Sequence, residues 1–323
     1  MTFEQVIESA VGYESLAAFG KGKEYLERYD NIACAVSGGS DSDIMVDMVV
    51  KLDKDRKVKY VFFDTGIEYA ATKKHLDFLE TKYGIIIERV RATKTVPASC
   101  MEHGIPWFSK YVSDMMGRLQ HNGFQWEDDS FEVLIKKYPR CTTALKWWCN
   151  ANGASSGFNI SRNKLMKEFI VSHPPQFKIS DKCCKYAKKM PSEKYCKDNG
   201  IDLLLLGLRR SENGIRSKAY KSCFSEKEMR SEWRPLFWIT DEEKLDYKTH
   251  NNITFSDCYE VYGLKRTGCF GCPFASGFEN ELALIERYEP LYFWRQIIFS
   301  GKVMSICVCT GSSRRKCGEK KLY

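Results

Sequence analysis

The chain has 323 residues, of which 43% are hydrophobic and 28% are charged, and its formal net charge is +8. This composition excludes a globally disordered chain, and the apolar runs are far shorter than the ~20 residues that span a bilayer, so no membrane association is expected. The 14 cysteines are unusual. Because the N-terminus lacks the pattern of a secretory signal peptide, we expect a cytoplasmic protein whose cysteines bind a metal or cluster, act in redox chemistry or pack in the core.

Strand and helix patterns alternate along the first 90 residues. Two short apolar runs are each followed by a glycine turn and then by apolar residues at helical spacing, and a third apolar run follows. The predicted segments are strand 31–36, turn 37–42, helix 43–50, strand 58–63, turn 64–66, helix 69–83 and strand 85–90. This alternation predicts an α/β fold with a doubly wound, mostly parallel sheet.

The rest of the chain is less regular. A fourth strand is predicted over 203–206, and the tryptophan-containing stretch 93–179 before it is expected to form a helical insertion. After residue 217 the alternation stops. The predicted organisation is therefore a main domain over 1–217, which includes the insertion, and a small cysteine-rich subdomain over 218–323.

The turn after the first strand has the composition of an anion site. It reads Ser37-Gly38-Gly39-Ser40-Asp41-Ser42. The glycines permit positive φ and close approach of a phosphate, while the hydroxyls and the helix N-terminus add donors and a positive dipole end. The turn lacks the lysine of a Walker A loop and is not a Gly-x-Gly-x-x-Gly motif, which disfavours a P-loop NTPase and a dinucleotide site. An ordinary capped glycine turn is the alternative.

Three segments, in this order, resemble the adenine nucleotide α-hydrolase superfamily and its phosphoadenosine phosphosulfate (PAPS) reductase branch. The turn 37–42 is similar to the superfamily's Ser-Gly-Gly-x-Asp-Ser pyrophosphate loop, here called the PP-loop. Residues 62–68 are similar to the second-strand segment of the PAPS reductase branch, and 207–216 to its Gly-x-Arg-x-x-Glu signature. The resemblance implies that 1–217 is a nucleotide-binding domain.

The resemblance also assigns roles to individual residues. Besides the PP-loop, it implies an adenine-nucleotide site that includes Asp64, Gly207, Arg209, Glu212 and Arg216. The arginines follow a predicted strand, so they should emerge at the carboxyl edge of the sheet, where guanidinium groups suit phosphate or sulfate. Solvated surface charge is the alternative. The resemblance further implies that Asp41 is catalytic and holds a Mg²⁺ ion that bridges the phosphates of ATP.

Four cysteines resemble a cluster motif. Cys183 and Cys184 are adjacent, and Cys269 and Cys272 form a Cys-x-x-Cys; this arrangement is similar to the signature of assimilatory adenosine phosphosulfate (APS) reductases, whose four thiolates hold a 4Fe-4S cluster. Four thiolates also suit Zn²⁺.

Two further alternatives to this cluster motif remain open. Buried free thiols would need no metal. Adjacent cysteines do not easily face one metal, so Cys223 or Cys258 is a candidate substitute for one of the pair. Nearby cations, among them Lys188, are expected to lower the pKa of the thiols.

Two departures from the reductases bear on the activity. Sulfonucleotide reductases generally lack a complete PP-loop, whereas it is intact here. Their C-terminal Glu-Cys-Gly-Leu-His tail is reduced here to Cys317-Gly318. The first hypothesis is therefore an ATP pyrophosphatase that adenylates an acceptor and transfers sulfur to it. The alternative is an APS or PAPS reductase in which Cys317 is catalytic and forms sulfite.

Each hypothesis implies different partners. The first needs a sulfur donor such as a cysteine desulfurase, and the second needs thioredoxin. Tryptophans and basic residues interleave in the insertion, which is compatible with a nucleic-acid acceptor, although a tryptophan-rich helical core explains them more simply. A non-enzymatic nucleotide or redox sensor is disfavoured, because sensing alone does not need Asp41.

Overall fold

We analysed a computed structural model, which describes residues 2–163, 165–212, 220–275 and 278–291. The chain divides into two compact units: unit 1 contains 1–96 and 184–270, and unit 2 contains 97–183 and 271–323. Within the described ranges, no helix combines the length and the apolar character that a membrane crossing requires.

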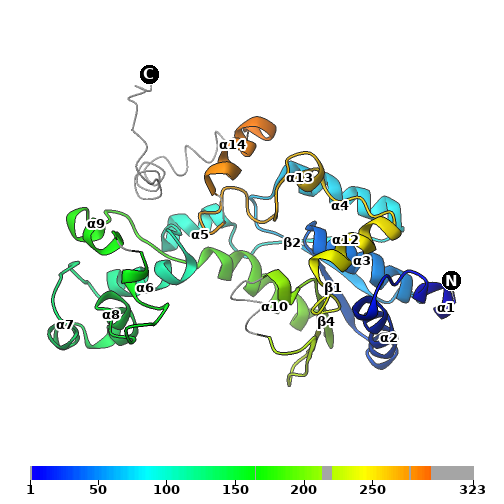
Figure 1. The fold of residues 1–323 in the computed structure, drawn as a ribbon, viewed down its shortest axis with the longest axis horizontal. Coiled ribbons are helices and arrows are strands. Elements are labelled where there is room, and N and C mark those ends of the chain that lie inside the picture. The colour runs from blue at the N-terminus through cyan, green and yellow to red at the C-terminus, as the bar shows by residue number, and fades with distance from the viewer. Residues whose placement is uncertain (1, 164, 213–219, 276–277, 292–323) are drawn as a thin grey trace. The chain divides into compact units, whose positions relative to one another are not determined.

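Unit 1 is built on one six-stranded sheet (Figure 1). Its strand order is β3-β2-β1-β4-β6-β5, and every neighbouring pair is parallel except β5 with β6. The strands are β1 (Ile32–Val36), β2 (Lys59–Asp64), β3 (Ile87–Arg91), β4 (Leu203–Leu206), β5 (Phe224–Ser225) and β6 (Ser231–Trp233). The predicted α/β class and mostly parallel sheet are confirmed.

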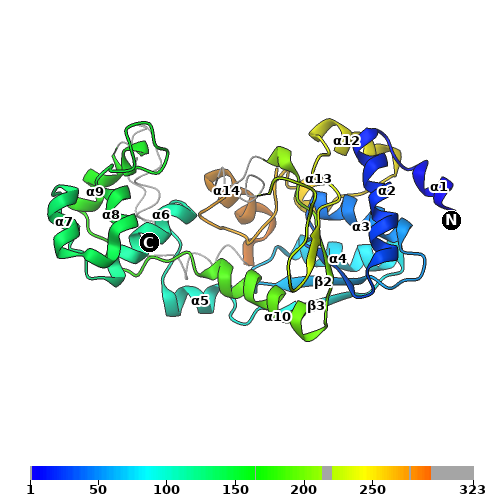
Figure 2. The same cartoon turned by 90° about the horizontal axis from the view of Figure 1, so that it is seen from below.

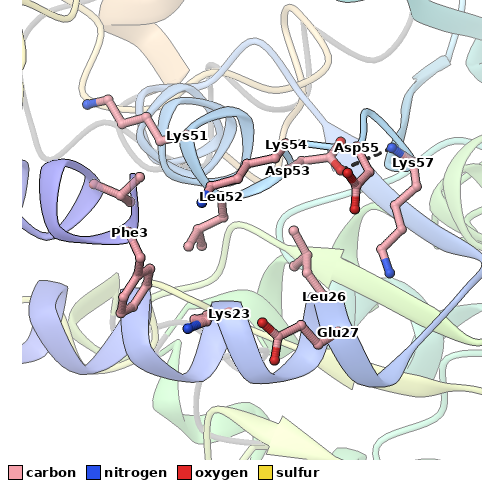
Figure 3. Close-up of a pocket in the computed structure, with 11 residues that line it drawn as sticks. Phe3, Lys23, Leu26, Glu27, Lys51, Leu52, Asp53, Lys54, Asp55 and Lys57 are labelled. Atoms are coloured by element: carbon pink, nitrogen blue, oxygen red, sulfur yellow. Dashed lines mark hydrogen bonds between the residues drawn. The ribbon is translucent and has the colours of Figure 1, made fainter. Parts of the chain in front are cut away.

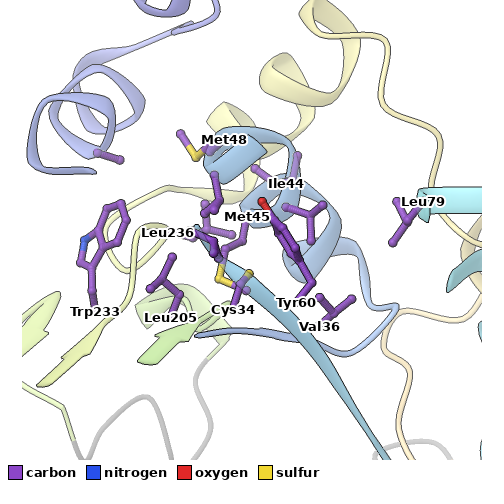
Figure 4. Packing of buried hydrophobic residues seen from close by; sticks show 14 of the residues in the cluster. Cys34, Val36, Ile44, Met45, Met48, Tyr60, Leu79, Leu205, Trp233 and Leu236 are labelled. Carbon is purple, nitrogen blue, oxygen red and sulfur yellow. The ribbon is translucent and has the colours of Figure 1, made fainter. Parts of the chain in front are cut away.

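Helices cover both faces of this sheet, and each face has its own core. The larger core joins α2, α3, α4 and α12 to alternate strand residues such as Cys34 and Leu205 (Figure 4). The smaller core packs α10 against the other strand residues, such as Ala33 and Leu204. The elements of unit 1 are α1 (Phe3–Ile7), α2 (Tyr13–Arg28), α3 (Ser40–Leu52), α4 (Ala70–Tyr83), η3 (Lys185–Lys189), α10 (Met190–Asp198), η4 (Arg210–Glu212), α12 (Asp241–His250) and α13 (Asp257–Glu260).

The predicted elements agree with these bounds to within a few residues. Residues 203–206 form β4 as expected, and α4 ends at Gly84, which adopts a left-handed φ of 61°. The third strand begins at Ile87 rather than at residue 85, and Ile86 is 85% exposed. Hydrophobicity alone therefore placed the start of this strand too early.

Unit 2 is helical over most of its described length (Figure 2). Its elements are η1 (Pro139–Cys141), α6 (Lys110–His121), α7 (Phe131–Lys137), α8 (Thr142–Trp148), η2 (Ile160–Arg162), α9 (Met166–Ser172) and α14 (Phe278–Tyr288), while α5 (Val96–His103) begins at the boundary between the units. Four tryptophans of the insertion are at most 8% exposed and share one core: Trp107, Trp126, Trp147 and Trp148. These rings pack in the interior, so they are not a stacking surface for bases.

The predicted domain boundary after residue 217 remains a prediction. The structure places β5 and β6, which follow that boundary in sequence, in the same sheet as β1–β4. It also groups 184–270 with the N-terminal residues. The parallel pairing of β6 with β4 places this later segment beside β4 in the sheet.

Candidate functional site

The PP-loop connects β1 to α3 and has the backbone expected of an anion cradle. Gly38 has a φ of 65°, and Gly39 is the extended N-cap residue of α3. The Ser37 N–H donates to Ser42 Oγ at 2.9 Å, which closes the loop on itself. The N-terminal turn of α3 provides the partial positive charge that favours an anion.

Close packing restricts two glycines beside this loop. A Cβ on Gly38 would lie 2.8 Å from Thr72 Cγ2 of α4, and a Cβ on Gly207 would lie 3.3 Å from the backbone N of Ser42. Gly207 follows β4, the strand next to β1. The glycines therefore allow α4 and the β4 segment to approach the PP-loop closely.

Asp41 is the centre of a charge cluster. Its Oδ1 accepts from Arg209 Nε at 2.8 Å and from Lys244 Nζ at 2.6 Å. Lys244 Nζ also donates to Ser40 Oγ at 2.6 Å, and Arg209 Nη1 donates to Asp241 Oδ1 at 2.6 Å. Arg209 is only 5% exposed. Two cations are thus directed at one carboxylate oxygen at the start of α3.

Glu212 lies beside the same cluster. One of its oxygens accepts from the backbone N–H of Arg209 at 3.3 Å, and Arg266 lies 3.6 Å from the other. Burial, followed by the nearby charge of Asp41, raises the pKa of Glu212 above its ordinary value. The predicted residues Gly207, Arg209 and Glu212 therefore gather at the PP-loop, whereas Arg216 lies outside the described residues.

Asp64 lies at the end of β2, where its carboxylate is oriented by local contacts. Its Oδ1 accepts from the Gly66 N–H at 2.8 Å, and Lys73 lies 3.4 Å from Oδ2. Burial acts to raise the pKa of Asp64, but the Gly66 hydrogen bond and Lys73 outweigh it and hold the pKa below its ordinary value. Asp64 is thus favoured in the ionised form.

The sequence did not identify four residues that contact the PP-loop or its charge cluster. Lys244 and Asp241 come from α12, and Tyr259 and Thr267 come from α13 and the segment after it. A Cβ on Gly39 would lie 3.3 Å from Tyr259 Oη and 3.2 Å from Thr267 Oγ1. Lys244, Tyr259 and Thr267 contact residues about 200 positions earlier in the chain, and Asp241 contacts Arg209, 32 positions earlier. No local pattern could have indicated these contacts, because the later segment returns to the PP-loop only through the parallel pairing of β6 with β4.

Cys269 lies close to this edge of the sheet. Its Sγ is 3.6 Å from Thr65 Oγ1, and the adjacent Phe270 N–H donates to the Ile67 carbonyl at 3.0 Å. Burial raises the pKa of Cys269; Lys188 opposes this, while the nearby Cys184 adds to it. Lys188 therefore acts on this thiol in the expected direction, but burial outweighs it and the net pKa of Cys269 is raised.

The other candidate cysteine ligands are divided between the two compact units. Cys183 and Cys272 belong to unit 2. In unit 1, the buried Cys258 lies 3.7 Å from Thr72 Oγ1, and Cys223 lies 3.5 Å from Lys21 Nζ. Among the described residues no group of three or more Cys, His, Asp or Glu side chains has the arrangement of a metal site, and no two cysteines form a disulfide. Cys317 lies outside the described residues.

Two pockets of unit 1 do not include the PP-loop. One, of about 150 Å³, is lined by side chains of α1, α2, the C-terminal end of α3 and the residues that follow α3 (Figure 3). The other, of about 490 Å³, is lined mainly by residues near the ends of α3 and α4 and the beginnings of β2 and β3. Neither lining contains a predicted site residue.

Individual relatives show limited similarity to this chain. An uncharacterized protein of Methanocaldococcus jannaschii is 32% identical over 124 residues, which cover 36% of this chain and 25% of that protein. The PAPS reductase of Candida auris, solved as a phosphate complex, is 15% identical with a TM-score of 0.42, and the match covers 77% of this chain and 88% of that one. The U34-tRNA thiolase NcsA of Methanococcus maripaludis, solved with its 4Fe-4S cluster, is 14% identical with a TM-score of 0.35 over 94% and 84%.

A family model matches more of the chain than the curated relative does. The phosphoadenosine phosphosulfate reductase domain matches residues 31–122 and 156–275. These ranges include the PP-loop, the Arg209 segment and all four cysteines of the predicted cluster. The chain therefore belongs to the phosphoadenosine phosphosulfate reductase domain family.

Proposed function

We propose that this protein is an enzyme that binds ATP at the PP-loop, cleaves it to AMP and pyrophosphate, and uses the adenylated acceptor for sulfur transfer. The main support is the complete PP-loop, with Arg209 and Lys244 directed at Asp41. A helix N-terminus, two cations and a carboxylate are the groups that a metal-bound polyphosphate requires.

The residues around Asp41 fit a Mg²⁺ ion. Mg²⁺ in phosphate sites is held by one or two carboxylates together with the phosphates and water, and Asp41 supplies one carboxylate that is 18% exposed. A bound Mg²⁺ would neutralise charge on the phosphates. Arg209 would then be free to pair with a phosphate oxygen, for which its planar guanidinium is suited.

The proposed reaction exchanges oxygen for sulfur without net oxidation or reduction. An acceptor oxygen attacks the α-phosphorus of ATP, the bond from that phosphorus to the bridging oxygen breaks, and pyrophosphate leaves. Hydrosulfide then attacks the activated carbon, and AMP leaves with the acceptor's oxygen. A nucleic-acid base is the acceptor that we propose to test. A cysteine desulfurase is a suitable source of the sulfur, provided that a thiol reductant converts its persulfide to hydrosulfide and is itself oxidised to a disulfide.

The cysteines fit a thiolate-bound cluster in their chemistry. Cys184 influences the pKa of Cys269, and the cation Lys188 opposes that influence. Together with Cys183 and Cys272 they would supply the four thiolates of a 4Fe-4S cluster, with Zn²⁺ as the alternative. Such a cluster would supply a soft site for sulfur. Thr65 and Ile67 hold the Cys269 segment against the loop after β2.

Product analysis tests this proposal. Protein reconstituted anaerobically is given ATP and Mg²⁺ with RNA or DNA, and in separate reactions APS or PAPS with thioredoxin. Equal amounts of AMP and pyrophosphate support the proposal. Sulfite that depends on thioredoxin, formed without any cleavage of ATP, contradicts it and supports the reductase alternative.

A variant of Asp41 tests whether the cleavage of ATP depends on the PP-loop. Asp41→Asn should lower the rate of AMP formation about a hundredfold or more, because metal-ion stabilisation of the transition state contributes several kcal/mol. Asp246→Asn, a change at an exposed residue of α12, is the matched control and should leave the rate unchanged. Equal rates in the two variants would show that the cleavage does not depend on Asp41.

A further inference from the structure

Lys244 gives the PP-loop a lysine that its own sequence lacks. Its Nζ lies 2.6 Å from both Asp41 Oδ1 and Ser40 Oγ, so it contacts the first two residues of α3. The lysine comes from α12, whose N-cap Thr240 accepts from the Glu243 N–H at 3.1 Å. This N-cap hydrogen bond therefore holds the first turn of α12, from which Lys244 extends.

The lysine is held in this place by its surroundings. Its side chain is 13% exposed, and its ammonium lies 5.5 Å from the centroid of the Phe255 ring. Asp41, however, already has a second cation, because Arg209 Nε donates to the same oxygen at 2.8 Å. Arg209 also pairs with Asp241, so two cations face two carboxylates here, and an anionic ligand that binds with a metal ion at Asp41 can take over the ammonium of Lys244.

We infer that Lys244 binds the pyrophosphate part of the nucleotide and so selects nucleoside triphosphates over AMP, an inference that rests on the proposed ATP site. Mg²⁺ and Lys244 compete for Asp41 in the free protein. When the metal-bound nucleotide occupies the loop, the ammonium transfers from Asp41 to an oxygen of the β- or γ-phosphate. Lysine is suited to this exchange because it is a flexible point charge with three donors.

Selectivity follows from the charge of the ligand. The β- and γ-phosphates of ATP carry more negative charge than the single sulfate of APS, and AMP has neither group. Removal of the ammonium should therefore weaken binding of ATP and of inorganic pyrophosphate much more than binding of AMP. The same change should strengthen the binding of Mg²⁺ alone, because Asp41 loses a competing cation.

Equilibrium binding to the full-length chain tests this inference. Titration calorimetry measures AMP, ATP and inorganic pyrophosphate in the presence of Mg²⁺, and Mg²⁺ alone, for the wild type and for Lys244→Met. We expect the affinity for ATP and pyrophosphate to fall about tenfold or more, which is the value of a charge-assisted hydrogen bond. The affinity for AMP should remain unchanged, and the affinity for Mg²⁺ alone should rise.

Lys248→Met is the matched control. Lys248 lies one turn further along α12, its ammonium is 4.7 Å from the same Phe255 ring, and it pairs with Glu260 at 2.6 Å, away from the PP-loop. This variant should bind all four ligands like the wild type. Equal losses for AMP and ATP in Lys244→Met, or no loss for ATP, would overturn the inference.

The two proposals fail in different ways. If the wild type binds ATP with the predicted Lys244 dependence but forms no AMP, the proposed reaction is wrong and the role of Lys244 stands. If Lys244→Met binds ATP normally and AMP still forms, the reaction stands and the role of Lys244 is wrong. If the wild type binds neither ATP nor pyrophosphate, both are wrong.

Discussion

Single residues of the PP-loop have separate physical roles. Gly38 adopts a left-handed φ of 65°, and a Cβ there would lie 2.8 Å from Thr72 Cγ2. Asp41 carries the charge that Arg209 and Lys244 balance. The sequence could indicate the glycine and the carboxylate, because both belong to a local motif. It could not indicate Lys244, which reaches the loop only through the folded chain.

The conformation of Gly38 leads to a stability prediction. Gly38→Ala should destabilise the protein by about 1–3 kcal/mol, because a left-handed φ is unfavourable for L-residues and Thr72 must move. Urea denaturation measures this change. Gly20→Ala is the control: Gly20 lies on the exposed face of α2, a Cβ there would meet no other atom within 4 Å, and the variant should gain up to about 1 kcal/mol of helix propensity. A neutral Gly38→Ala would show that the left-handed turn is not required.

The buried Asp43 leads to a prediction on pH. Its carboxylate is fully buried in the first turn of α3, 2.9 Å from His75 Nε2, and its second oxygen has no hydrogen-bond partner. Burial raises the pKa of Asp43, although His75 and Lys244 oppose this and Asp41 adds to it. A raised pKa in the folded state means that the charged form costs stability at neutral pH, and that this cost disappears as pH falls through the raised pKa.

Urea denaturation between about pH 8 and pH 5 tests this effect. The stability of the wild type should rise, relative to Asp43→Asn, as pH is lowered, because the variant has no carboxylate to protonate. Asp246→Asn, at an exposed position, should differ from the wild type by less than about 0.5 kcal/mol at every pH. Parallel curves for the wild type and Asp43→Asn would contradict the assigned shift.

At the scale of elements, the alternation of strand and helix could be predicted from the sequence. The addition of the later strands β6 and β5 to the same sheet could not. The periods of β1, α3, β2 and α4 are local, and glycine turns mark their ends. The later segment gives weaker signals, because β5 and β6 have only two and three residues. Their place in the sheet depends on pairing with β4, which is a long-range contact that periodicity does not report.

The position of α12 depends on a buried hydrogen bond. Tyr247 is fully buried, and its hydroxyl donates to Asp47 Oδ2 of α3 at 2.8 Å. Tyr247→Phe should lower the free energy of unfolding by about 1.5–3 kcal/mol, the usual contribution of a hydrogen bond to a charged group. Because α12 carries Lys244, affinity for pyrophosphate should fall as well. Tyr13→Phe, whose ring is 79% exposed, should change neither quantity; an equal effect of both variants would contradict this role.

The whole molecule is organised around a sheet unit and a helical unit, and both contain predicted cluster ligands. Cys184 and Cys269 belong to unit 1, and Cys183 and Cys272 to unit 2. The cysteine spacing could suggest a cluster, because the adjacent pair and the Cys-x-x-Cys are each a short local motif. The spacing could not show that the four cysteines are divided between two compact units. It also gave no sign that burial would raise the pKa of Cys269.

Metal content tests the cluster. Protein purified anaerobically should contain iron and sulfide and show charge-transfer absorbance, and Cys184→Ser and Cys269→Ser should lose both, since each removes a proposed thiolate ligand. Cys149→Ser is the control, because Cys149 is half-buried in unit 2 and is not a predicted ligand. A colourless protein with stoichiometric zinc would contradict the iron-sulfur assignment and leave the thiolate ligands in place.

The central claim is that the PP-loop acts on ATP rather than on a sulfonucleotide. A competition assay tests it most directly: the reconstituted protein receives equal concentrations of ATP and APS with Mg²⁺, thioredoxin and the nucleic-acid acceptor, and AMP, pyrophosphate and sulfite are measured together. We predict pyrophosphate equal in amount to AMP, and no sulfite. Sulfite equal in amount to AMP, with no pyrophosphate, would contradict the proposed function.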